Sequence, residues 1–264
     1  LQNLTIKGKE LPYKARSGNI VDCNKISYSF PDEETIKNWG FNPGYNIISA
    51  IDMRDISQDV TTSVIAGSNS EIYMSLDNLY MTEWIWSADN YDCPPNAMCA
   101  MPFFWGGTQN TLVHKLNIDK QNISYHDSAL VPGAPLTQYS MDEYNGNFRI
   151  ITSQWAPERS TWLYILDNNL KSVSSLTNLA PGETFQSSRF IADKLFLVTF
   201  EQIDPLFAID LSDTTKPKVL GELKIPGFST YLHPYDENHL IGLWYDTQLN
   251  EWGGTQTAGV KVDL

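Results

Sequence analysis

The chain has 264 residues, of which 42% are hydrophobic and 12% are aromatic, so it can bury a sizeable core as one large β domain or two smaller ones. Its 18 basic and 31 acidic residues give a net charge of −13, which argues against a nucleic-acid partner. No apolar run approaches the roughly 18–20 residues that a membrane-spanning helix needs, so we expect no transmembrane segment.

Residues 1–44 are expected to form an N-terminal lead-in segment and part of one repeat unit. The alternation of polar and apolar residues over 20–30 predicts a strand. The following 30–44 reads as a connecting loop with one helical turn, which Asp32 caps and Gly40 ends. The sequence carries two Asn-x-Ser/Thr glycosylation signals, at Asn3 and Asn122.

From Tyr45 onward a motif of short strands occurs four times. In each copy a strand ends near an Asp or Asn, a glycine follows 15–17 residues later, and a tight turn comes 10–12 residues after the glycine. We expect each glycine to need a positive φ or a close backbone approach. These structural glycines lie 66, 49 and 45 residues apart and are Gly67, Gly133, Gly182 and Gly227.

A period of roughly 40–50 residues built only from short strands is typical of a β-propeller, whose blades bury both faces by packing on one another. We therefore predict an all-β propeller with four complete blade-like units and partial blades. The units run over about 45–86, 108–156, 160–202 and 204–246, and a fifth begins at 258–264. We expect the chain to be a fragment of a larger propeller. The alternative is closure of 258–264 onto 20–30.

An insertion over 87–107 lengthens the first period. Within it, Cys93 and Cys99 bracket a short loop that contains two prolines, and we expect them to form a disulfide in a secreted protein. Cys23 then stays a thiol, and its pairing with either of the other two is the alternative. The aromatic residues around the insertion are candidates for stacking a sugar or a partner, or for burial under the insertion: Trp84, Trp86, Phe103, Phe104 and Trp105.

The segment 229–239 concentrates polar and aromatic side chains. As a functional site it would form the rim of a propeller channel and bind a cation or a polar ligand. As a structural feature it would be a blade corner followed by a hairpin turn. The candidate channel-mouth residues are Tyr231, His233, Tyr235 and Asp236.

A second polar group occupies 142–149. Asp142 and Glu143 are adjacent, so in a strand they point to opposite faces and make a poor acid/base pair. We interpret Arg149 as the partner of one carboxylate in an ion pair that holds neighbouring blades together. Arg189 in the next unit invites the same interpretation.

The Asp-rich bends near Asp52 and Asp210 lack the spacing, central glycine and final glutamate of a calcium-binding loop, so we expect Asx turns there. We expect no metal site and no cofactor. The chain also lacks the motifs of serine hydrolases, phosphate-binding loops and zinc proteases.

The text "FEQIDPLFAIDLSDTTKPKVLGELKIPGFSTYLHPYDENHLIGL" over 200–243 resembles a family of secreted bacterial and archaeal proteins with a C-terminal β-propeller domain. Segments 70–81, 139–152 and 187–200 resemble other stretches of the same family, and the resemblance covers about 45–264. It implies a propeller and an extracellular or cell-surface setting. It implies no reaction, catalytic residue or cofactor.

These observations favour a non-catalytic binding or scaffold module with an unknown protein or glycan partner. Further blades of the same protein, or another copy, are also expected partners. One alternative is a hydrolase or lyase that acts on polysaccharide at the channel mouth. Another is a structural subunit of a surface assembly with exposed blade edges.

Overall fold

The computed structural model describes most of the chain from residue 44 onward. The described residues are 5–6, 9–10, 26–28, 44–55, 57, 60–67, 70–87, 108–155, 158–200, 204–225, 227–236, 239–249 and 255–264. In this part of the chain the structure is nearly all strand and contains no α-helix, which confirms the predicted fold class. No described helix is long and apolar enough to span a bilayer.

Five sheets follow one another along the chain, after a small two-stranded pair of β1 (Thr5–Ile6) and β2 (Lys9–Glu10). Sheet 1 has the order β3-β5-β4, with β3 (Ile26–Tyr28) parallel to β5 (Thr61–Ala66) and β4 (Tyr45–Ala50) antiparallel to it. Sheets 2, 3 and 4 are four-stranded antiparallel meanders, and sheet 5 has three described strands.

The strands of these sheets have the following bounds. Sheet 2 comprises β6 (Ile72–Met74), β7 (Asn78–Ser87), β8 (Thr108–Asp119) and β9 (Asn122–Pro132). Sheet 3 comprises β10 (Met141–Tyr144), β11 (Asn147–Gln154), β12 (Ser160–Leu166) and β13 (Ser172–Leu179). Sheet 4 comprises β14 (Thr184–Ile191), β15 (Lys194–Phe200), β16 (Asp204–Asp210) and β17 (Lys218–Ile225). Sheet 5 comprises β18 (Phe228–Pro234), β19 (Leu240–Leu249) and β20 (Thr255–Asp263).

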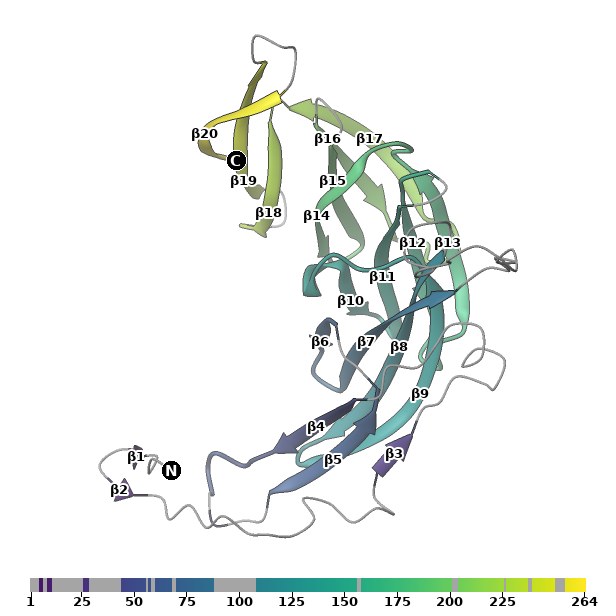
Figure 1. Ribbon diagram of the computed structural model, residues 1–264, viewed down its shortest axis with the longest axis vertical. Helices are drawn as coiled ribbons and strands as arrows, with labels where there is room; N and C mark the ends of the chain where they lie inside the picture. The colour runs from purple at the N-terminus through teal and green to yellow at the C-terminus, as the bar shows by residue number, and fades with distance from the viewer. Residues whose placement is uncertain are drawn as a thin grey trace, which may run out of the picture.

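The five sheets form an open arc, with sheet 1 at one end and sheet 5 at the other (Figure 1). The innermost strands β6, β10, β14 and β18 follow its concave side, and the outermost strands β9, β13 and β17 follow its convex side. The described part of β20 pairs with β19, and β3 pairs with β5, so these two strands do not close a ring on each other.

Sheet boundaries fall half a unit away from the predicted repeats. The predicted unit 108–156 covers the two outer strands of sheet 2 and the two inner strands of sheet 3, and 160–202 straddles sheets 3 and 4 in the same way. The segment 258–264 belongs to the third strand of sheet 5, where we expected the first strand of a new unit. A repeat has no intrinsic starting point, so its period does not show where one sheet ends.

Each pair of successive sheets encloses its own hydrophobic core. Between sheets 3 and 4, for example, Ile151 and Leu163 pack with Leu195 and Leu197. Separate clusters join sheets 1 and 2, sheets 2 and 3, and sheets 4 and 5. This arrangement explains why the centre of β15, "LFLVTF", is apolar on both faces, since sheet 4 is covered by sheet 3 on one side and by sheet 5 on the other.

The turns have the conformations that the sequence predicts for them. Asn145 and Gly146 both have positive φ, as a two-residue hairpin between β10 and β11 requires. The Asx turns are also present, because Asp52, Asp167 and Asp210 each accept a hydrogen bond from the backbone N–H two residues later. Arg54 bonds the same Asp52 carboxylate and lowers its pKa to about 2.

Candidate functional site

The four predicted glycines all have positive φ, and they lie where the chain crosses from one sheet to the next. Gly133, for instance, follows the outermost strand of sheet 2, and its N–H donates to the Gln109 carbonyl at 2.9 Å. Gly67 and Gly182 make the same kind of bond, to Gly44 and Arg159. These bends return the chain to the concave side, so each new sheet begins with an inner strand.

A cleft of about 570 Å³ opens among these inner strands, and we name it the inner-strand cleft. It is bounded by β6, β10, β14 and a short 3-10 helix, η3 (Gln138–Ser140), whose N-terminus is capped by the Thr137 hydroxyl. Of the residues predicted to form polar pairs, Asp142 and Arg189 both line this cleft. The other lining residues are Ile72, Tyr73, Met74, Leu79, Gln138, Tyr139, Met141 and Phe190.

Arg189 is half-buried, and its guanidinium lies 4.7 Å from the centre of the Tyr139 ring. The neighbouring Ser188 hydroxyl donates to the Tyr139 carbonyl at 3.1 Å and holds η3 against β14. Among the described residues Arg189 forms no ion pair, so it differs from the carboxylate-paired arginine that we expected. The cause is its position on the innermost strand of sheet 4, which faces the cleft rather than a neighbouring sheet.

Two of the predicted channel-mouth residues, Tyr231 and His233, lie next to Tyr139 and Arg189. The Tyr231 ring packs edge-on against Tyr139 at 5.5 Å between centroids. Its hydroxyl lies 3.3 Å from Nδ1 of His233, and the two rings are stacked at 6.1 Å. Arg189, Tyr139, Tyr231 and His233 therefore form one continuous row along the concave side.

Tyr235 and Asp236 are not part of this row. Asp236 lies in the turn between β18 and β19, where its carboxylate accepts the His239 backbone N–H and contacts the His239 ring, both at 2.8 Å. Tyr235 is 68% exposed in the same turn. The hairpin interpretation therefore describes these two residues, and the channel-mouth role of Tyr231 and His233 on the preceding strand stays a prediction.

Arg149 is fully buried and bonds the Asp142 carboxylate across the β10–β11 hairpin. This ion pair lies within one sheet, whereas we expected it to join two. The link to sheet 4 comes from the arginine itself, whose Nη1 donates to the Ala192 carbonyl at 2.7 Å and whose guanidinium lies 4.9 Å from the Phe190 ring. Asp142 therefore enters the cleft with its charge already compensated.

Glu143 turns to the opposite face and joins sheet 3 to sheet 2. Its carboxylate accepts the Ser75 hydroxyl at 2.7 Å and the Asn78 amide at 2.9 Å. Burial, together with the Glu143 carboxylate beside it, raises the pKa of the Tyr80 hydroxyl. The two adjacent carboxylates thus face different sheets, and they cannot act on one bond.

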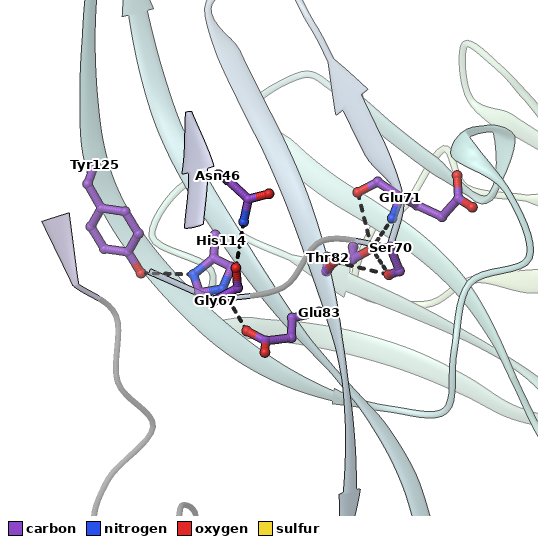
Figure 2. A network of polar contacts seen from close by, with 8 residues as sticks. All are labelled: Asn46, Gly67, Ser70, Glu71, Thr82, Glu83, His114 and Tyr125. Carbon is purple, nitrogen blue, oxygen red and sulfur yellow. Dashed lines mark hydrogen bonds and ion pairs between the residues drawn. The ribbon is translucent and has the colours of Figure 1, made fainter. Parts of the chain in front are cut away.

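A buried polar network that the sequence did not reveal lies between sheets 1 and 2 (Figure 2). Glu83 and His114 come from neighbouring strands, with 3.8 Å between Oε2 and Nε2, and Nδ1 of His114 lies 3.4 Å from the Tyr125 hydroxyl. A Cβ atom at Gly67 would lie 2.7 Å from Oε2 of Glu83. The bare glycine therefore leaves room for this carboxylate.

Glu71 belongs to a second group of contacts in Figure 2, where its backbone N–H donates to the Thr82 hydroxyl and its carbonyl accepts from that hydroxyl. Burial raises the pKa of the Glu71 carboxyl, and the Gln138 backbone N–H partly opposes the shift. A raised pKa in the folded state stabilises the fold below the pKa of the unfolded chain, and this contribution is lost as the pH rises through the folded value.

We therefore expect Glu71→Gln to raise Tm at pH 7 and to bring no gain at pH 3, because the buried amide stays uncharged as the pH rises and the carboxyl does not. The amide oxygen can still accept the Gln138 N–H. Thermal unfolding at the two pH values measures the effect, with the exposed Glu222→Gln as the control. An equal change in Tm at both pH values would contradict the assigned cause.

The predicted aromatic surface is described only in part. Trp84 is 48% exposed and lines a second cleft of about 370 Å³, together with Trp155. Trp86 lies on β7. Phe103, Phe104 and Trp105 lie outside the described residues, as do Cys23, Cys93 and Cys99, so the disulfide stays a prediction. Across the described part of the chain, no three His, Cys, Asp or Glu side chains gather in a way that could hold a metal ion.

Comparison with known proteins places this architecture in a family. Relatives include an uncharacterized protein of Methanocaldococcus jannaschii, 42% identical over 146 residues, and an uncharacterized protein of Archaeoglobus fulgidus, 41% identical over 161 residues. The matches cover 54% and 58% of this chain but only 23% and 24% of the relatives, and neither name indicates secretion or a position for the domain. The model of the family described as "Beta propeller domain" matches residues 3–264, and the chain therefore belongs to that family.

Proposed function

We propose that this propeller module is a non-catalytic binding module whose inner-strand cleft binds a carboxylate group of a protein partner. The observation that carries the proposal is Arg189, a half-buried guanidinium stacked on Tyr139 that has no carboxylate partner among the described residues. The chain has 31 acidic and 18 basic residues, so most cations have carboxylates to pair with. A half-buried cation that lines a cleft and has no counter-ion among the described residues can instead pair with the carboxylate of a ligand.

The surroundings of Arg189 indicate the chemistry of the ligand. A planar guanidinium binds a carboxylate through two parallel hydrogen bonds, and the ring beneath it limits its rotation. Apolar side chains share the cleft, and Ile72 and Met74 are 44% and 66% exposed. An acidic residue flanked by apolar ones in a peptide segment matches this combination.

A polysaccharide hydrolase or lyase is the alternative. The bonding partners of the Asp142 and Glu143 carboxylates argue against it. Glycoside hydrolysis needs two carboxyl groups about 5–10 Å apart that face one bond. Asp142 is bonded to Arg149, and Glu143 is bonded to Ser75 and Asn78 on the other side of the sheet.

Arg189→Gln is expected to weaken binding of an acidic peptide by more than about tenfold, because one charge-assisted contact contributes about 1.5–3 kcal/mol. The probe is a short peptide with glutamate between leucines, titrated by calorimetry, and its glutamine counterpart is the neutral probe. Arg54→Gln is the matched control, since Arg54 is exposed and already paired with Asp52.

Equal affinity of wild type and Arg189→Gln for the acidic peptide would refute the role of Arg189. A uronic-acid oligosaccharide serves as a second probe. Binding of that probe alone, lost in Arg189→Gln, would make the ligand a glycan and overturn the protein partner.

We also propose that the module works outside the cell or on its surface, supported by the resemblance noted in the sequence and by the exposed glycosylation signal at Asn122. Labelling of intact cells with a reagent that does not cross membranes tests this setting.

Apolar side chains on the end sheets support packing against additional sheets, of the same protein or of another copy. On sheet 5, Leu243 faces Val262 and Tyr245 faces Val260 across β19 and β20, and all four are at least 38% exposed. On sheet 1, Tyr45 and Ile47 are 71% and 51% exposed. Sedimentation at rising protein concentration tests association between copies.

A further inference from the structure

We propose that the second cleft, which we name the tryptophan cleft, binds a neutral oligosaccharide. This site is separate from the inner-strand cleft, and the proposal does not depend on the role of Arg189. Three features of the cleft carry it: two exposed indoles, two glutamine amides that line it, and a balanced charge.

The tryptophan cleft lies where sheets 2, 3 and 4 meet. Trp84 of β7 and Gln109 of β8 come from sheet 2. Gln154 is the last residue of β11 and Trp155 follows it, and the beginning of β14 supplies Gln186. Its volume is about 370 Å³. The lining side chains therefore come from strands of three sheets or from residues next to them.

Two tryptophans provide flat surfaces on this cleft. Trp84 is 48% exposed and Trp155 is 60% exposed, which is costly for the largest apolar side chain unless a ligand covers it. Trp155 is also held in place, because the Arg159 guanidinium lies 4.9 Å from its ring and donates to the Thr184 hydroxyl at 3.1 Å. The apolar C–H face of a pyranose ring can stack on such an indole.

Two glutamines supply hydrogen-bonding groups of a kind that suits hydroxyls. Gln109 and Gln154 line the cleft and are each only 8% exposed, yet neither side-chain amide bonds another described residue. Their amides line the cleft, and each amide offers two donors and two acceptor lone pairs. Sugar hydroxyls both donate and accept, so they can satisfy the two halves of an amide at once.

The charges of the cleft favour an uncharged ligand. Arg159 brings one positive charge, and Glu183 brings one negative charge, whose carboxylate accepts the Thr199 hydroxyl. An anionic ligand would gain from Arg159 but would be repelled by Glu183. A neutral glycan is not repelled by Glu183, and its hydroxyls can donate hydrogen bonds to that carboxylate.

The test titrates the whole chain with cellotetraose, maltotetraose, mannotetraose and chitotetraose, and follows tryptophan fluorescence and calorimetric heat. We expect at least one of these sugars to bind, and Trp155→Ala to weaken its binding by at least about tenfold, since aromatic contact and lost burial together exceed about 1.4 kcal/mol. Gln154→Ala is expected to weaken binding in the same way. Tyr235→Ala, which removes a similarly exposed aromatic ring elsewhere, is expected to have no effect.

Circular dichroism and Tm establish that each variant folds, and the exposure of Trp155 makes its replacement tolerable. Arg189→Gln is expected to bind the sugar as wild type does, which separates this site from the inner-strand cleft. The proposal is overturned if none of the four sugars binds at concentrations up to about 10 mM. It is also overturned if only a uronic-acid oligosaccharide binds, or if Trp155→Ala binds the sugar as tightly as wild type does.

Discussion

Replacing Gly227 with valine is expected to lower the free energy of unfolding by about 3 kcal/mol or more, since a strained backbone and a steric clash add together. Gly227 has a φ of +99°, a backbone conformation that residues with a Cβ rarely adopt. This glycine lies where the chain crosses from sheet 4 to sheet 5. A Cβ there would lie 2.2 Å from the Tyr245 carbonyl oxygen, a backbone atom of β19 that cannot turn aside. Urea unfolding measures the loss.

Two other glycines separate the contributions to this loss. Gly182 has φ +85 but nothing within 4 Å of an added Cβ, so Gly182→Val is expected to cost only the backbone strain, about 1–2 kcal/mol. Gly259 in β20 has neither problem, and Gly259→Val is expected to change stability by less than about 0.5 kcal/mol. Equal losses at Gly227 and Gly182 would show that the close approach to Tyr245 is unimportant.

Replacing Arg149 with leucine is expected to cost about 3–5 kcal/mol, because it leaves a partly buried carboxylate without its partner. The guanidinium is 1% exposed and makes bonds on two sides, to Asp142 in its own hairpin and to the Ala192 carbonyl of sheet 4. The variant therefore loses both a charge pair and a connection between sheets. Unfolding in urea measures the cost.

The double variant Asp142→Asn/Arg149→Leu is expected to recover part of this loss, since the uncompensated charge is then gone. Arg54→Leu is the matched control, because the Arg54–Asp52 pair is exposed, and its removal is expected to have little effect. A loss as small as that of Arg54→Leu would mean that the buried pair does not stabilise the interface between sheets 3 and 4.

Much of the candidate site could not be predicted from the sequence. Arg149 and Arg189 lie in similar sequence segments. Arg149 is buried on the second strand of sheet 3 and paired with Asp142, whereas Arg189 lies on the innermost strand of sheet 4 and lines a cleft. Strand position depends on where a sheet begins, and the repeat period does not show this. Tyr139 was not singled out, since its role depends on contacts with β14 and β18.

The tryptophan cleft shows the same limit. Trp84 was a candidate from its neighbourhood in the chain, but Trp155, Gln109 and Gln154 were not. They gather because three sheets meet at that point, and no local pattern of residues marks such a meeting. The buried pair of Glu83 and His114 was missed for a related reason, since an insertion separates the two residues along the chain.

The sequence by itself determined the fold class, the repeat and its bends. Alternating strands, the Asn-Gly turn, the Asx turns and the four glycines depend on the conformational preferences of residues close together in the chain, and each of these local features appears in the structure. Only the tertiary structure decided which strands form one sheet, which arginine has no carboxylate partner among the described residues, and where clefts open. These properties depend on packing between sheets, where residues tens of positions apart meet and where burial, not local preference, sets the energy of a charge or an amide.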